Sequence, residues 1–517
     1  MNQSISNRIF KGTLIVVSVG IIAKLTAFLA EAVLAAYLGT TYQSDAYYMI
    51  TSVHAVIYPM MSVGIWQVFL PLYKGHITKS ENDAAHSITD KTLSFFFLIS
   101  LGVVVLLLVF APIVVSVVAP GFKGDTKELC IKLVRLSSPM YFFIVASAVY
   151  ASVLQCHNKF LGSQIREVAS HIPIILAAVL FYKNSGIEAL AIALVFAGVL
   201  RLLVELPFVN WGYRYKPDLN LKGEEFALML RRLPSALVSA GVAQLNTLID
   251  KAMASMLPTG TVSCLNYGNK LMNVFSGLVS SAIATATYPQ IIELIALDQK
   301  EELGKMLTKI INTFSVLMFP ITLACILFRE ELVSAVFERG AFNSQSTALT
   351  ASVFALYCLG LFFVAVNMVM SNVFYGHGDT KTPMYISMAN LAVNVVLNIV
   401  LISIWGVNGL ALATSLSAII SFFLRMRAAR KYVHMNHLGM LITTGKVLVA
   451  STVACSVPRI VFWIQPVNKY LLLVSSTLIG VGVYYLLVKL LKVPEVDELL
   501  SLINKKIKEH RLMASSP

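Results

Sequence analysis

The sequence predicts an all-α polytopic membrane protein of about 14 transmembrane helices, arranged as two six-helix lobes related by an internal repeat, plus two C-terminal helices. Three observations support this fold class. Apolar segments of membrane-spanning length recur throughout the 517 residues, only 13% of the residues are charged, and the two halves resemble each other. Soluble domains carry about 25% charged residues, so the composition excludes an ordinary soluble protein. The short alternating strands typical of a membrane β-barrel are not seen in the sequence.

Each of the apolar segments is long enough to cross a hydrocarbon layer roughly 30 Å thick. Val, Ile and Leu dominate the segments, and Gly and Ser occur inside them, as is typical of packed membrane helices. The predicted spans are 12–38, 46–73, 92–119, 130–155, 160–182, 185–211, 233–257, 261–292, 306–328, 345–375, 382–404, 406–424, 443–464 and 468–488.

An internal repeat relates the first six spans to the next six. His157 in VLQCHNKF corresponds to His377 in VFYGHGDT, and Gly186 corresponds to Gly406; each pair lies 220 residues apart. Self-similarity at a fixed period is an architectural signal. Many secondary transporters consist of two related lobes with the substrate path between them. The repeat therefore favours transport.

The repeat and the spans together predict the organisation of the chain. We expect an N-terminal lobe at 1–213, a cytoplasmic linker at 214–232, a C-terminal lobe at 233–433, two further helices at 434–491 and a cytoplasmic tail at 492–517. After Pro494, apolar residues recur at helical spacing among lysines. This pattern predicts either a short amphipathic helix on the inner membrane surface or a frayed tail.

The basic residues predict the orientation of the chain. Arg8 and Lys11 precede the first span, whereas the link at 39–45 contains no Lys or Arg. Basic residues return after the second, sixth, eighth and twelfth spans and at the C-terminus, which places both termini in the cytoplasm. The net charge of +14 is therefore explained by basic residues beside the spans, which orient the helices and contact anionic lipid. We expect no nucleic-acid partner.

No catalytic motif is apparent, so the sequence predicts a transporter and not an enzyme. There is no P-loop, GxSxG or HExxH motif. The segment GHGDT (376–380) holds His and Asp, but one such pair in a loop is weak evidence for catalysis. The six cysteines are scattered without a CxxC pair and are expected to be packing residues, neither metal ligands nor disulfides. We expect no metal site and no cofactor other than a coupling cation or the membrane potential.

Ionisable residues inside the spans are the candidate site, because each is costly in the membrane unless it is paired or faces water. Lys24 lies near the middle of the first span, with Glu31 two turns further along the same face. Lys270 reaches a similar depth in the eighth span. One lysine from each lobe could bind an anionic group such as a phosphate. The structural alternative is that each lysine reaches the interface or pairs with an acid.

The seventh span contains a polar stretch that includes Asn246, Asp250 and Lys251. Asn246 and Asp250 share a helix face and could line a cavity or hold a cation, while Asp250 and Lys251 could instead neutralise each other.

Further polar residues in the spans are predicted to have structural roles. Arg201 and Glu205 are spaced for a local ion pair. His54 is expected to be a packed or hydrogen-bonded histidine. The third feature is a stripe formed by Asn390, Asn394 and Asn398, which favours helix–helix hydrogen bonds over substrate binding.

Several segments resemble the MurJ-type lipid II flippases of bacteria, which belong to the multidrug/oligosaccharidyl-lipid/polysaccharide exporter superfamily. They are VFERGAFNSQST (336–347), NVFYGHGDTKTP (372–383) and NVVLNIVLISIWGVNGLALATSLSA (394–418), supported by LGTTYQSDAYY (38–48) and the region 263–289. The resemblance implies alternating access by two rocking lobes, which would move an undecaprenyl-diphosphate-linked cell-wall precursor across the inner membrane. It also implies that 434–491 forms a groove for the lipid tail.

The resemblance carries over to the candidate residues only in part. Lys24 and Lys270 stand where the family has arginines, and Ala30-Glu31 replaces an Arg-Asp pair. Asp45 matches an acidic residue that follows the first span in the family, and Tyr58 stands where an arginine is expected.

The expected substrate is a lipid-linked saccharide with a diphosphate, most simply lipid II. Membrane lipids and polymer-synthesis enzymes are further expected partners. The alternatives are a flippase for a capsule, teichoic-acid or exopolysaccharide unit, a cation-coupled drug antiporter, or a non-transporting scaffold. The missing arginines favour the first alternative, whereas an antiporter would need a dominant carboxylate in its cavity.

Overall fold

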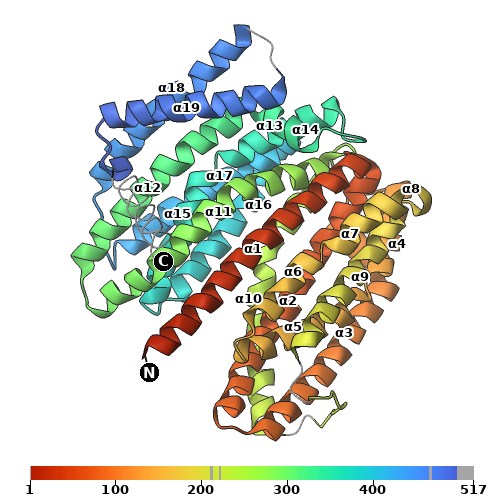
Figure 1. Ribbon diagram of the computed structural model, residues 1–517. Helices are drawn as coiled ribbons and strands as arrows, with labels where there is room; N and C mark the ends of the chain where they lie inside the picture. The colour runs from red at the N-terminus through yellow and green to blue at the C-terminus, as the bar shows by residue number, and fades with distance from the viewer. Residues whose placement is uncertain (1, 210–212, 221–222, 465–467, 498–517) are drawn as a thin grey trace, which may run out of the picture. The chain divides into compact units, whose positions relative to one another are not determined.

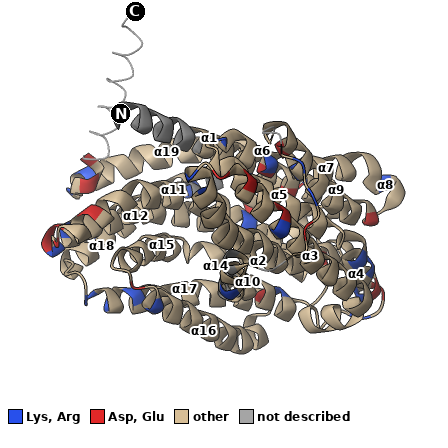
Figure 2. Ribbon diagram, turned by 90° about the horizontal axis from the view of Figure 1, so that it is seen from below, with Lys and Arg blue, Asp and Glu red and all other residues tan. Residues whose placement is uncertain are grey.

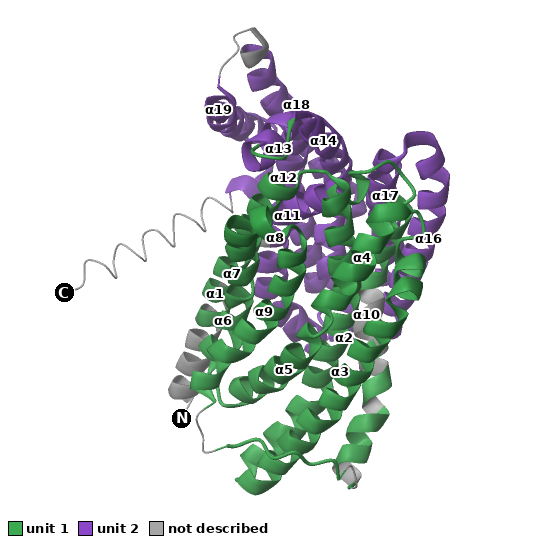
Figure 3. Cartoon of the chain, turned by 90° about the vertical axis from the view of Figure 1, so that its right-hand side faces the viewer, with its two compact units in different colours: residues 1–263, 339–343 green, residues 264–338, 344–517 purple. Residues whose placement is uncertain are grey.

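The computed structural model describes residues 2–209, 213–220, 223–464 and 468–497 (Figure 1). Within these ranges the regular elements are all helical. The helices group into two compact units, coloured separately in Figure 3. Unit 1 consists of residues 1–263 and 339–343, and unit 2 consists of residues 264–338 and 344–517.

Unit 1 is built around α2 and α5, which carry many of its buried residues. Helix α2 packs against α10 and α5, and α5 also packs against α9. Small residues allow the close approaches, as at Gly162, which faces the ring of Phe208. The elements are α1 (Asn2–Leu38), α2 (Tyr42–Thr78), α3 (Asn82–Val118), α4 (Gly124–Ser137), α5 (Met140–Cys156), α6 (Phe160–Ala169), α7 (Ile172–Leu176), the π-helix η1 (Ala177–Phe181), α8 (Tyr182–Ser185), α9 (Glu188–Glu205), the 3₁₀ helix η2 (Leu206–Phe208) and α10 (Glu224–Ala254).

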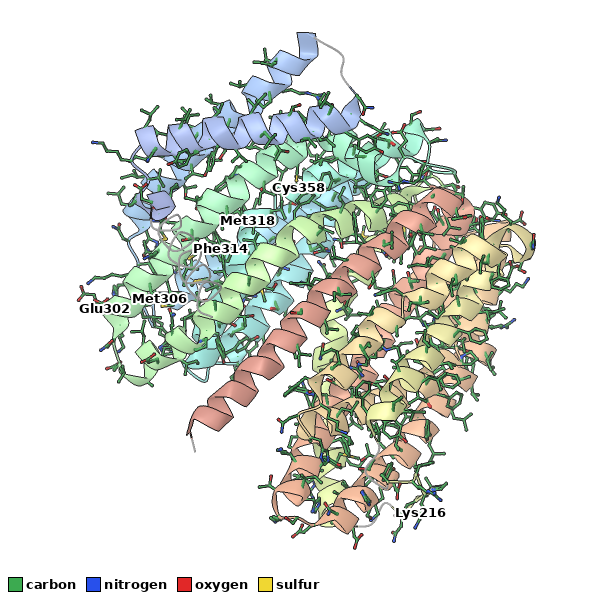
Figure 4. The ribbon with its side chains drawn as sticks, viewed as in Figure 1. Lys216, Glu302, Met306, Phe314, Met318 and Cys358 are labelled. Carbon is green, nitrogen blue, oxygen red and sulfur yellow. The ribbon has the colours of Figure 1, made fainter. Side chains whose placement is uncertain are left out.

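Unit 2 contains the remaining helices and an apolar core along α12. Phe314 and Met318, labelled in Figure 4, are fully buried in this core, together with Phe374 of α15. The helices are α11 (Thr261–Ala296), whose first three residues belong to unit 1, α12 (Lys300–Leu327), α13 (Arg329–Phe337), α14 (Ser344–Cys358), α15 (Leu361–Gly376), α16 (Lys381–Trp405), α17 (Val407–Ala429), α18 (His437–Ile464) and α19 (Lys469–Leu490).

The predicted polytopic all-helical class is confirmed. Eleven helices in the described ranges are long and apolar enough to span a membrane, and two bent helix pairs raise the number to 13. Helix α10, predicted as the seventh span, is 31 residues long but is not among them. Figure 2 shows that most of the helical ribbon carries no charged residue, as the composition predicts.

Two of the predicted spans each consist of a bent helix pair, and the sequence did not predict the bends. The segment 130–155 lies on α4 and α5, which meet at 44°, and 345–375 lies on α14 and α15, which meet at 42°. Pro139 stands at the first junction and Gly360 at the second. Proline cannot donate the backbone hydrogen bond that a continuing helix needs, and glycine weakens helices.

The internal repeat is visible in the local geometry of each unit. Gly186 and its counterpart Gly406 both adopt positive φ, at 65° and 55°, and each is the C-cap of a helix, α8 and α16 respectively. His157 and His377 both cap the C-terminus of the second helix of a bent pair. Positions 220 residues apart therefore hold the same backbone conformation, as expected for a duplicated architecture.

Part of the predicted C-terminal amphipathic segment lies in 498–517, outside the described residues. Its described start packs onto unit 2. Val493 and Val496 join a small apolar cluster with Val316 of α12, Val447 of α18 and Val488 of α19.

Candidate substrate site

Lys24 and Glu31 lie on α1, as predicted, and their surroundings differ. The Lys24 side chain is exposed, and no carboxylate within 4 Å of it is found among the residues with described side chains. Glu31 is half-buried and accepts a hydrogen bond of 2.9 Å from the Tyr48 hydroxyl of α2. Lys24 is therefore available to a ligand, whereas Glu31 is held by the protein.

A polar cluster in unit 1 joins α1, α2 and α10 around Tyr48. Besides its bond to Glu31, Tyr48 lies beneath the Lys251 ammonium, which is 5.8 Å from the ring centroid and 3.5 Å from the Tyr48 carbonyl oxygen. A cation over an aromatic face is attracted by the ring quadrupole. Lys251 and Asp250 are both buried, at 6% and 5% exposure. The Asn246 side-chain oxygen is also buried, without a hydrogen-bond partner in the described part of the chain.

Lys270 lies on α11 in unit 2, and its side chain is exposed. Asn269, directly before it, accepts a 2.8 Å hydrogen bond from Asn273, three residues after it. Lys24 and Lys270 belong to different units, and their joint role stays a prediction.

Asp45 has a clear local role at the start of α11. Its carboxylate is 2% exposed and accepts hydrogen bonds from the backbone N–H of Gly260 (2.6 Å), the backbone N–H of Ser263 (2.8 Å) and the Ser263 hydroxyl (2.8 Å). The first N–H groups of a helix have no partner within the helix, and a carboxylate there also favours the helix dipole. Asp45 therefore acts as a helix cap supplied from a distant part of the sequence.

A buried ionic cluster in unit 1 overturns the predicted local pair of Arg201 and Glu205. The Arg201 guanidinium instead binds Glu167 of α6 in a bidentate manner, at 3.2 and 2.5 Å, and donates to the Tyr58 hydroxyl at 2.5 Å. The nearest cation to Glu205 is Arg166, at 3.6 Å. Spacing along one helix identified the charged residues but could not reveal partners on a neighbouring helix.

The cluster also clarifies one departure from the family pattern. Tyr58 stands where the resemblance implies an arginine, and here its hydroxyl receives a hydrogen bond from the Arg201 guanidinium of α9. Helix α2 has no arginine at position 58, but the guanidinium of Arg201 on α9 lies next to it.

An apolar groove of about 370 Å³ lies in unit 2 between α12, α18 and α19. The Tyr484 hydroxyl is tied to the Val316 carbonyl at 2.7 Å at this groove, so its polar end is satisfied. The lining is mainly apolar and includes Leu317, Ile321, Ala324, Ala454, Pro458, Leu473, Gly480 and Val481. Such a surface suits a hydrocarbon chain.

The GHGDT segment forms a helix junction. Asp379 accepts hydrogen bonds from the Thr382 backbone N–H (2.9 Å) and the Tyr432 hydroxyl (2.8 Å), so it caps α16. His377 bonds the Val373 carbonyl at 2.9 Å and stacks on Tyr432. These contacts lower the pKa of Asp379 to about 2, chiefly through the Thr382 N–H.

Other polar residues are placed as structural links. His54 is buried between the Tyr141 hydroxyl (2.6 Å) and the Ser137 hydroxyl (2.7 Å), which confirms the prediction. Asn394 is hydrogen-bonded to Asn398 on its own helix and, at 3.5 Å, to Thr414 of α17.

The cysteines and the other side chains able to bind a metal form no further site in the described ranges. All six cysteines are buried, without a disulfide. No group of three His, Cys, Asp or Glu side chains suited to a metal is found in the described ranges.

These features define a multi-pass helical membrane protein with an apolar groove and with cationic side chains within its spans. The model of the family described as Lipid II flippase MurJ matches residues 34–482. A probable lipid II flippase MurJ of Rickettsia prowazekii is 24% identical over 505 residues, covering 95% of this chain and 99% of that protein. One from Thermotoga maritima is 26% identical over 487 residues, covering 92% and 96%.

The fold agrees with this match. A solved structure described as lipid II flippase MurJ in an inward closed conformation superposes with a TM-score of 0.80, at 22% identity, covering 92% of this chain and 98% of the other. Because the family model covers most of the sequence, this chain belongs to the lipid II flippase MurJ family.

Proposed function

We propose that this protein moves lipid II across the bacterial inner membrane, without chemical change, by alternating access. The observation that carries the proposal is the family match over residues 34–482, which extends across both halves of the repeat and into α19. The curated relatives named above carry the same description over nearly the whole chain. The missing arginines are the sequence feature that favours a flippase for another polyprenyl-linked saccharide, whereas the family match does not favour it.

Lys24 and Lys270 are the residues proposed to bind the diphosphate. Support comes from the exposure of both side chains and from the lack of a carboxylate beside Lys24 in the described residues. An ammonium acts as a point charge toward phosphate and needs no fixed fork geometry. Lysine can therefore replace the arginine that the family has at these positions.

The groove between α12, α18 and α19 is proposed to hold part of the polyprenyl tail. Its lining is mainly apolar, so a hydrocarbon chain would contact few polar groups there. The groove would then keep the tail beside the protein while the polar head crosses the membrane.

Energy is proposed to come from a cation gradient or the membrane potential. A ligand can shift a conformational equilibrium only through different affinities for its states. Glu31 and Asp250 are the proposed cation-sensitive carboxylates, since both lie in or next to predicted spans. If Glu31→Gln and Asp250→Asn leave transport and its ion dependence at wild-type values, this assignment is wrong.

Complementation tests the function and the site together. The chain would be expressed in bacteria depleted of their own lipid II flippase, beside Lys24→Ala/Lys270→Ala and Lys24→Arg/Lys270→Arg double variants. Wild type and the arginine variant should restore growth, and the alanine variant should not. A matched control is Lys132→Ala/Lys300→Ala, which removes one exposed lysine from each unit.

The outcomes separate the cargo from the site. Growth with the alanine variant at equal membrane levels would keep lipid II and reject the lysine site. Failure of a well-inserted wild type would reject lipid II as the cargo.

A further inference from the structure

Unit 2 contains a buried arginine whose hydrogen-bond partners are all uncharged. Arg425 of α17 is 7% exposed. Its guanidinium donates to the hydroxyls of Ser371 (2.7 Å), Ser387 (3.3 Å) and Ser421 (3.4 Å). In the described part of the chain, no carboxylate lies within 4 Å of it. A buried charge without a counter-charge is unfavourable. An anionic ligand near the Arg425 guanidinium would compensate this charge.

The internal repeat supplies an informative comparison. At the 220-residue offset, Arg425 corresponds to Glu205, Ser387 to Glu167 and Ser421 to Arg201. In unit 1 these positions belong to the cluster of two arginines and two glutamates, whose formal charges cancel. In unit 2 the corresponding positions hold one guanidinium and hydroxyl groups, with a formal charge of +1. In the second half of the repeat, an arginine stands where the first half has Glu205, and serines stand where it has Glu167 and Arg201.

The hydrogen-bond inventory of this cluster contains more donors than acceptors. A guanidinium has five N–H donors, and the serine hydroxyls engage three of its nitrogens. The Ser371 hydroxyl donates to the Asn367 carbonyl at 2.8 Å. For the hydroxyls of Ser387 and Ser421, no acceptor is found within the described residues. Surplus donors around a positive charge are the pattern that an anion satisfies.

The cluster is also within reach of a ligand. Ser387 is exposed, although Arg425 and Ser421 are buried. The planar guanidinium fork matches two oxygens of a phosphate, and hydroxyl donors can bind a third. Arg425 lies four residues before the C-terminal end of α17. The negative end of the helix dipole therefore compensates only part of the positive charge of its guanidinium.

We propose that Arg425, Ser387 and Ser421 form a binding site for a phosphate-type oxyanion. The oxyanion could be the phosphodiester of an anionic phospholipid or free phosphate. The site is distinct from the proposed lysine site and does not depend on the transport proposal.

Binding to the purified full-length protein tests the site. Native mass spectrometry in detergent would compare added phosphatidylglycerol with added inorganic phosphate, each in a separate titration. We expect Arg425→Gln to weaken binding of one of the two at least tenfold. Arg427→Gln is the matched control, because Arg427 is exposed two residues further along the same helix. Loss of phosphatidylglycerol binding identifies the lipid as the source, and loss of phosphate binding identifies the free ion.

Two further variants cover the case in which Arg425→Gln fails to fold. Ser387→Glu restores the carboxylate that Glu167 supplies in unit 1, so it should pair with Arg425, keep the fold and abolish binding. Ser387→Gln, which has the same size without the charge, should retain more binding than Ser387→Glu. If Ser387→Glu binds both anions as tightly as wild type, the proposal is wrong and Arg425 is a structural cation.

Discussion

The Asp45 carboxylate satisfies three donors at the start of α11 although it lies more than 200 positions earlier in the sequence. Asp45→Ala would leave these donors without a partner, and loss of a helix cap typically costs about 1–2 kcal/mol. We therefore expect a lower melting temperature in detergent. Asp83→Ala removes an exposed acid from the first turn of α3 and should have little effect. Equal melting temperatures for the two variants would contradict the capping role.

The Asp379 carboxylate should contribute a pH-dependent term to stability. Its pKa falls to about 2 in the folded protein, below the ordinary value of 3.8, because the Thr382 N–H and other donors favour the charged form. A depressed pKa stabilises the fold above the unfolded value, and that contribution is lost as the pH falls from about 4 toward 2. Thermal unfolding of wild type and Asp379→Asn should therefore converge over this range. A constant difference between them would contradict the assignment.

Single residues were predictable from the sequence where the environment was local. The burial of His54 followed from its apolar neighbours, and hydrogen bonding was the expected way to satisfy it. The ion pairs were not predictable, because Arg201 pairs with Glu167 on another helix. The expected partner, Glu205, lies on the same helix as Arg201. Helical spacing defines a face, but tertiary packing decides which face meets which partner.

At the level of elements, the groove between α12, α18 and α19 offers a direct test of the lipid-tail proposal. Gly480 lines the groove, and Gly482 on the same helix does not. Gly480→Phe should fill the groove and reduce transport, while Gly482→Phe meets open space and should leave transport near the wild-type rate. The transport rates of both variants can be measured as flipping of labelled lipid in proteoliposomes. Equal rates would show that the tail does not need this groove.

The positions of the helices were largely predictable, because a membrane span has a fixed minimum length and a simple composition. The bends were harder to predict. Pro139 and Gly360 mark the two junctions, but proline also occurs inside continuous helices here, as at Pro59 of α2. A helix breaker signals a possible bend, and neighbouring helices decide whether one forms.

For the whole molecule, the distribution of basic residues predicts an orientation that cysteine labelling can test. All six native cysteines are buried, so the background should be low. In intact spheroplasts, an impermeant maleimide should label Asp125→Cys and Ser344→Cys, which lie on predicted outer links. Asn82→Cys and Gln299→Cys, on predicted inner links, should react only after the membrane is opened. The four positions are exposed, so a reversed pattern would mean a reversed orientation.

The sequence was most informative for the whole molecule, since the repeat, the spans and the family resemblance all rest on patterns spread along the chain. It was less informative for the site. Lys24 could be found as a charge inside an apolar segment, but the role of Tyr48 in linking Glu31 and Lys251 needed coordinates. Its hydroxyl and ring make contacts that no spacing rule predicts.

The length of α3 has a mechanical consequence. Its 37 residues extend about 55 Å at 1.5 Å per residue, against a hydrocarbon layer of roughly 30 Å. Its polar first part, at 82–91, precedes the predicted span 92–119 and therefore extends beyond the apolar layer on one side. A tilt of about 10° around the middle of the helix moves the tip of this part by roughly 5 Å. Small rotations within the bilayer can thus produce large openings at the membrane surface.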